Sequence, residues 1–60
     1  MTYLKIKLPI GTKAKTGQTC PESGIWSPSD GADTAPIAKG NRMPPSGRRN
    51  GVTWTLIQHA

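Results

Sequence analysis

Cys20 and His59 are the residues of this sequence best suited to nucleophilic chemistry, because a thiolate can attack an electrophile when a base lies beside it. His59 is the only histidine and is next to the last residue given, which is a poor place for a base that must be held rigidly. The two residues also supply only half of the ligands that a structural zinc site needs. We therefore expect Cys20 to be a small buried hydrophobic residue and the chain to bind no metal.

Acid–base chemistry would need two carboxyl groups held across a cleft. The three carboxylates, Glu22, Asp30 and Asp33, lie among Pro, Ser and Gly residues. In such segments, short polar side chains such as Asp commonly form turn hydrogen bonds. No glycine is followed by the Lys-Ser or Lys-Thr pair of a phosphate-binding loop. We expect turn roles for the carboxylates, no cofactor, and a protein that is not an enzyme.

Basic residues outnumber acidic ones, with eight Lys plus Arg against three Asp plus Glu and a net charge of +5. Such a surface favours anionic partners such as nucleic acid or an acidic protein surface, although it can also serve only to keep a small protein in solution. The few aromatic residues leave little for stacking on single strands. The candidate phosphate contacts are Lys5, Lys7, Lys13, Lys15, Arg48 and Arg49.

The two tryptophans have different surroundings in the sequence. Trp54 lies in an alternating segment and is expected in the core, whereas Trp26 lies between two turn motifs. Trp26 could cap the core or stand exposed as an interface anchor, since aromatic residues dominate binding hot spots. The candidate protein interface is therefore Trp26, Ile25 and Tyr3.

Strands must position these residues. Residues 3–10 and 52–58 alternate apolar and polar side chains with a period of two, which predicts two half-buried strands close to each other or paired. Residues 11–15 are expected to form a polar basic connection. Residues 37–39 are the remaining apolar patch that could form a central strand.

Turn signals separate the strands. Thr16-Gly17 and Gly40-Asn41 predict tight turns. The segments 20–24 and 27–31 share Pro at the second position and Gly at the fifth, which favours a type I turn followed by a left-handed glycine. Ile25 and Trp26 would then be bracketed by two similar turns.

These patterns predict an all-β fold, because no window of ten residues carries a helical apolar period free of Gly and Pro. We expect one domain over residues 1–60, a small SH3-like partly open barrel or meander of four to five short strands with little or no helix. The expected core consists of Leu4, Ile6, Leu8, Ile25 or Trp26, Ile37, Met43, Val52, Trp54 and Leu56.

Size makes association attractive for this chain. Sixty residues bury only about 60% of the surface that the unfolded chain exposes, and neither a disulfide nor a zinc site is available from these residues. We expect self-association through a strand edge or an apolar face to add buried surface area. There is no apolar run long enough to span a bilayer and no secretory signal, so we expect no membrane association and a cytoplasmic protein.

Three pieces of the sequence resemble a group of small bacterial proteins. They are Thr16-Gly17 with Cys20-Pro21, Ser23-Gly24 and Trp26, then Gly40 to Pro44 with Met43-Pro44, then Trp54-Thr55-Leu56. This pattern is similar to accessory or immunity-like proteins associated with bacterial type VI secretion. The resemblance implies a protein-binding role and assigns no catalytic residue.

The leading hypothesis is a non-enzymatic β module that binds another protein or a second copy of itself through Trp26 and the turns around it. The alternative is a basic nucleic-acid-binding module.

Overall fold

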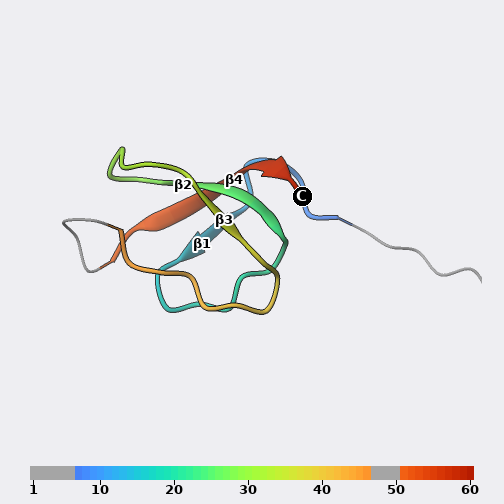
Figure 1. The fold of residues 1–60 in the computed structure, drawn as a ribbon, viewed down its shortest axis with the longest axis horizontal. Coiled ribbons are helices and arrows are strands. Elements are labelled where there is room, and N and C mark those ends of the chain that lie inside the picture. Colours follow the sequence, from blue (N-terminus) through green and yellow to red (C-terminus); the bar gives the residue numbers. More distant parts are fainter. Residues whose placement is uncertain (1–6, 47–50) are drawn as a thin grey trace, which may run out of the picture.

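The computed structural model describes residues 7–46 and 51–60, and this part of the chain is all-β, as the sequence predicts. Its four strands are β1 (Lys13–Lys15), β2 (Gly24–Pro28), β3 (Ala35–Ile37) and β4 (Thr53–His59). These residues include no helix, and so none that could cross a membrane. Figure 1 shows the short strands joined by long turns.

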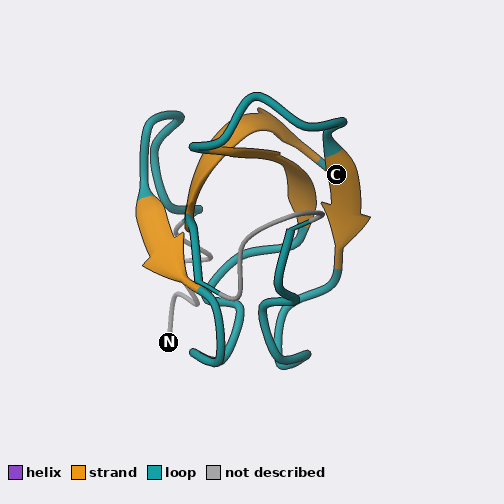
Figure 2. Ribbon diagram, turned by 90° about the vertical axis from the view of Figure 1, so that its left-hand side faces the viewer, coloured by secondary structure: helices purple, strands orange, loops and turns teal. Residues whose placement is uncertain are grey.

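All strand pairs are antiparallel, and the order across the sheet is β1-β4-β2-β3. The longest strand, β4, lies between β1 and β2, so the end of the chain organises segments that are far apart in sequence. Figure 2 shows that the sheet curls strongly, as expected of a partly open barrel. Its concave side holds the core.

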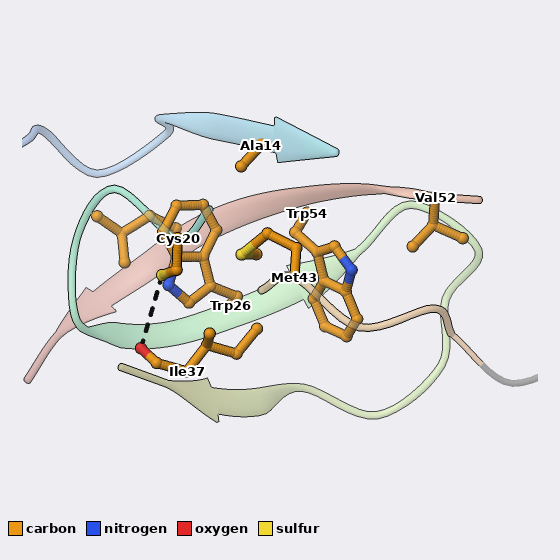
Figure 3. Packing of buried hydrophobic residues seen from close by; sticks show 8 residues of the cluster. Ala14, Cys20, Trp26, Ile37, Met43, Val52 and Trp54 are labelled. Carbon is orange, nitrogen blue, oxygen red and sulfur yellow. Dashed lines mark hydrogen bonds between the residues drawn. The ribbon is translucent and has the colours of Figure 1, made fainter. Parts of the chain in front are cut away.

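The core follows from alternation along the two inner strands. Trp26 on β2 and Trp54 and Leu56 on β4 point to the concave side, and each is at most 3% exposed. Figure 3 shows the Met43 side chain between the two indole rings. The complete buried hydrophobic cluster is Ala14, Cys20, Trp26, Ile37, Met43, Val52, Trp54 and Leu56.

Two loop segments run antiparallel to each other and complete the enclosure of the core. Cys20 N–H donates to the Asn41 carbonyl at 2.6 Å, and Met43 N–H donates to the Gln18 carbonyl at 2.7 Å. Thr19 and Arg42 form a bridge between the same segments. This pairing carries the Cys20 and Met43 side chains into the core, where both are 1% exposed.

Positive-φ glycines form two of the expected turns. Gly17 (φ 91°) occupies a turn in which Gln18 N–H donates to the Lys15 carbonyl. Gly40 (φ 93°) occupies the turn that Asn41 N–H closes on the Ala38 carbonyl. Residues other than glycine seldom adopt these positive φ angles, so both turns depend on glycine.

The prediction of two similar turns, at segments 20–24 and 27–31, is only partly correct. Gly31 has φ 80° and donates to the Pro28 carbonyl, which places Pro28 at the first position of that turn and not at the second. Gly24 is not left-handed and is the first residue of β2. A glycine suits this position because β4 passes too close for a side chain: a Cβ there would meet the Gln58 carbonyl oxygen and lie 2.7 Å from Leu56 Cδ1.

The predicted first strand and first connection are also corrected. Residues 7–10 form no strand, and residues 1–6, including Leu4 and Ile6 of the expected core, lie outside the described residues. Residues 13–15, expected as part of a polar connection, form β1, because Ala14 is small enough to pack inward while both lysines point outward. Leu8 is half-buried and does not join the core cluster.

The other strand predictions have mixed outcomes. Ile37 ends β3, which lies at one end of the order of described strands and not at its centre, because β2 pairs with β4 on its other side. The predicted final strand is confirmed as β4, with Trp54 and Leu56 inward and Thr53 and Thr55 half-exposed.

Candidate protein-binding groove

The convex side of the sheet carries a row of side chains across three strands. Ile25 on β2 pairs with Gln58 on β4 and with Pro36 on β3. Ile25 is half-buried, and the other two are exposed. Because neighbouring strands lie about 4.8 Å apart, the row presents a continuous strip of mixed apolar and amide surface.

A β-bulge in β4 lies next to this strip. Ile25 pairs with Gln58 and Trp26 pairs with Leu56, which leaves Ile57 as an extra residue on β4. Such a bulge bends the strand and redirects the side chains next to it. Ile57 is 45% exposed, one of two large hydrophobic side chains that the described chain exposes; the other is Ile10, at 53%.

An open groove of about 460 Å³ lies over the end of the sheet beyond the bulge. Its residues come from the start of β2, from β3 and the turn after it, and from the end of β4. They are Ser23, Gly24, Ile25, Pro36, Ile37, Ala38, Asn41, Gln58, His59 and Ala60. Apolar side chains with polar groups around them are the usual anatomy of a protein interface.

Hydrogen bonds fix the rim of the groove at the end of β4. The Leu8 carbonyl can only accept, so His59 Nε2 donates to it, at 2.6 Å. Leu8 N–H donates to Glu22 Oε1 at 3.1 Å, and Ala60 N–H donates to the Ser23 carbonyl at 3.3 Å. The described chain therefore begins beside a groove residue, His59.

Trp26 lies in the core, and its interpretation as an exposed anchor is wrong. It is 0% exposed, because alternation along β2 directs it to the concave side and directs Ile25 to the convex side. Its Nε1 donates to the Glu22 carbonyl at 3.1 Å, which satisfies the polar atom of the buried ring. Of the three candidate interface residues, Ile25 lines the groove, and Tyr3 lies outside the described residues.

Cys20 is buried, as expected from the sequence, and is 1% exposed. Its Sγ lies 3.1 Å from the Glu22 carbonyl and 3.8 Å from the Ile37 carbonyl, the contact drawn in Figure 3. Over residues 7–46 and 51–60, no three His, Cys, Asp or Glu side chains are grouped so that they could hold a metal ion. The thiol links the turn before β2 to the end of β3.

Asp30 has the turn role predicted for it. Its Oδ1 accepts from Ala32 N–H at 3.0 Å, within the turn after β2. The same oxygen accepts from Ser46 Oγ at 3.0 Å and so ties this turn to a distant loop. Both bonds are structural, as expected of a carboxylate among turn residues.

The candidate basic residues do not all lie together on one surface of the structure. Lys13 and Lys15 point outward from β1, and Lys13 Nζ donates to Thr55 Oγ1 at 3.3 Å. Lys15 also lines a second groove, of about 370 Å³, with Thr16, Ser29, Gly51, Val52 and Thr53.

Lys7 precedes Leu8, at the opposite end of β4 from Thr53, the partner of Lys15. Seven residues of strand span about 20 Å, so Lys7 does not share a cluster with Lys15. Lys5, Arg48 and Arg49 lie outside the described residues.

Sequence reasoning missed most of the groove. Pro36, Gln58 and His59 carry no shared motif, and only the register of three strands brings them together. The one available signal was that Ile25 and Trp26 are neighbours on a strand and so face opposite sides, but the sequence left open which of the two is buried. Comparison with protein-family models, with curated proteins and with solved structures finds no match for this chain.

Proposed function

We propose that this chain is a non-enzymatic protein-binding module whose docking surface is the groove around Ile25. The observation that carries the proposal is the groove itself, with Ile25, Pro36 and Ile37 contributing apolar surface and the rim residues contributing hydrogen-bonding groups. An apolar centre with a polar rim favours a protein partner over a small polar metabolite.

Two further features support the same function. Ile57 and Ile10 are large exposed hydrophobic side chains in neighbouring segments, since Gly11 N–H donates to the Leu56 carbonyl at 2.7 Å. Hydrophobic surface on a small protein commonly marks an interaction site. The resemblance to accessory or immunity-like proteins of type VI secretion also implies a protein partner, and we propose that the partner belongs to that class of system.

Affinity capture with two matched variants tests the proposal. Ile25→Asp places a charge at the centre of the groove, whereas Thr55→Asp places the same charge on the convex side outside the groove. A captured protein, produced separately, should bind Thr55→Asp like the wild-type chain and should bind Ile25→Asp at least about tenfold more weakly, since burial of an Ile side chain contributes about 1.5–3 kcal/mol. Equal affinity of the two variants would refute the groove as the docking surface.

A basic nucleic-acid-binding module is the second candidate, and the observation that favours it is the outward pair Lys13 and Lys15 beside the second groove. We propose that phosphate would be held there, with Lys13→Gln and Lys15→Gln lowering affinity and reducing its salt dependence by about one unit of slope each. Titration of single-stranded DNA at several salt concentrations measures this. Because Lys7 lies far from Lys13 and Lys15, the proposed contact covers only a short stretch of the nucleic-acid backbone.

A further inference from the structure

Two cations border the groove around Ile25 in the turn after β3. Lys39 N–H donates at 2.7 Å to the Oγ of Ser23, which lines the groove. Arg42 directly follows Asn41, another lining residue. The side chains of Lys39 and Arg42 are both exposed. This side of the groove therefore carries positive charge that a bound molecule can reach.

The opposite side of the rim carries one cation and one carboxylate. Lys7 is exposed and precedes Leu8, whose carbonyl accepts from His59 of the groove. Glu22 is half-buried, and its Oε1 accepts from Leu8 N–H at 3.1 Å. Both aspartates of the chain follow the end of β2 that lies away from the groove. Three exposed cations and one hydrogen-bonded carboxylate thus border the groove, which favours an acidic occupant.

The outer strands favour docking on the face of the sheet over the addition of a strand at its edge. In β1, Lys15 N–H donates to Gln18 Oε1 at 2.6 Å, and the Lys15 carbonyl accepts from Gln18 N–H at 3.0 Å. A strand added beside Lys15 would have to displace both bonds. In β3 the middle residue, Pro36, has no N–H to donate. Because such features discourage strand addition, we expect a partner to lie across the groove.

The floor of the groove suits a segment with an apolar side chain. Ile25 pairs with Gln58 on one side and with Pro36 on the other, and side chains paired across strands share a face of the sheet. An apolar side chain can therefore pack on Ile25 and Pro36 while the exposed Gln58 amide forms hydrogen bonds to the backbone of the segment. Asn41 supplies a second exposed amide side chain among the lining residues.

We propose that the groove binds an acidic segment of the partner protein, in which an apolar side chain covers Ile25 and Pro36 and neighbouring Asp or Glu residues meet Lys39 and Arg42. This inference rests on the proposed function, because it names the kind of segment that the same groove takes. Exposed ion pairs contribute little affinity each. The cations therefore select acidic segments and speed their association, while the apolar contact supplies most of the affinity.

Selection of peptides from a displayed random library against the full chain tests the proposal. The selected peptides should carry an apolar residue with Asp or Glu close to it in sequence. In fluorescence anisotropy, a labelled selected peptide should bind Ile25→Asp at least about tenfold more weakly than Thr55→Asp, which carries the same charge outside the groove. Far-UV circular dichroism verifies folding, and Pro36→Glu replaces Ile25→Asp if that variant loses its spectrum.

Charge variants test the acidic character of the segment. Lys39→Gln and Arg42→Gln should each weaken binding of the same peptide about two- to fivefold, and the loss should shrink in about 1 M salt. The matched control is Lys13→Gln, which removes an exposed cation from β1 and should leave the affinity unchanged. A peptide with its Asp and Glu replaced by Asn and Gln should bind Lys39→Gln and Lys13→Gln equally.

Two outcomes would overturn the acidic segment and leave the proposed function standing: selected peptides that need Ile25 but are neutral or basic, or rim variants that bind as tightly as Lys13→Gln. Displacement of the peptide by an equimolar amount of single-stranded DNA would also overturn it, because the cations would then hold phosphate. The proposed function fails separately. A selection that yields no peptide, or only peptides that bind Ile25→Asp and Thr55→Asp equally, would refute the groove as a docking surface.

Discussion

Gly24 offers the sharpest test of the packing that shapes the groove. It lies in β2, where that strand passes the bulge of β4, and both neighbours of a new methyl group belong to β4. One of them, the Gln58 carbonyl oxygen, is part of the backbone and cannot rotate away. Gly24→Ala must therefore separate β2 from β4 or distort the bulge.

The expected loss follows from two opposing effects. Overpacking of a well-filled site costs about 1–3 kcal/mol. Replacing Gly by Ala also reduces the conformational entropy of the unfolded chain, which stabilises the folded protein by about 0.4–1 kcal/mol. The net loss should be about 1–2 kcal/mol. A domain of sixty residues has a total stability of about 3–9 kcal/mol, so the loss is a considerable fraction of it.

Thermal unfolding followed by circular dichroism measures this loss. For a chain of this size Gly24→Ala should lower the Tm by about 5–15 °C. The matched control is Gly51→Ala, where a Cβ meets nothing within 4 Å and φ is not positive. Its Tm should stay the same or rise slightly, because only the unfolded-state effect applies.

A Gly24→Ala variant as stable as Gly51→Ala would refute the close approach of β2 to β4. It would mean that the bulge at Ile57 leaves room for a side chain. The floor of the groove would then be wider than the register of Ile25 with Gln58 implies.

Three other substitutions or reactions test the interior. Trp26→Phe removes the indole donor but keeps most of the ring, and should lower the free energy of unfolding by about 1–2 kcal/mol in urea denaturation, since a buried carbonyl loses a partner. Thr16→Val should cost about 1–3 kcal/mol, because the Thr16 hydroxyl accepts from Val52 N–H at 3.1 Å, whereas Thr12→Val, at an exposed turn, should cost less than about 0.5 kcal/mol. Cys20 should react with a thiol reagent slowly in the folded chain and rapidly in urea, and fast labelling without denaturant would contradict its burial.

Local patterns were sufficient for part of the fold. Alternation over residues 52–58 predicts β4 and the inward side chains Trp54 and Leu56, because a period of two directly encodes the two faces of a strand. The turns at Gly17 and Gly40 follow in the same way from a conformation that glycine adopts readily.

Non-local packing decides what the sequence could not reveal. Lys13-Ala14-Lys15 is short and basic, and only its pairing with Thr53 to Thr55 makes it a strand. The bulge at Ile57 has no marker in sequence, yet it sets which side chains of β4 reach the groove. Trp26 was ambiguous because burial depends on which face of β2 meets the core, and that is fixed by β4.

The central proposal is that the groove around Ile25 is the binding surface of this protein. Amide chemical shifts recorded by NMR while the concentration of the chain, or of a captured partner, is raised test it most directly. The chemical-shift changes should be concentrated at Ile25, Ile37, Ala38 and Gln58, with little change at Lys13, Lys15 and Thr55. Changes confined to the lysine-bearing strand β1 and its surroundings, with the groove amides unmoved, would contradict it.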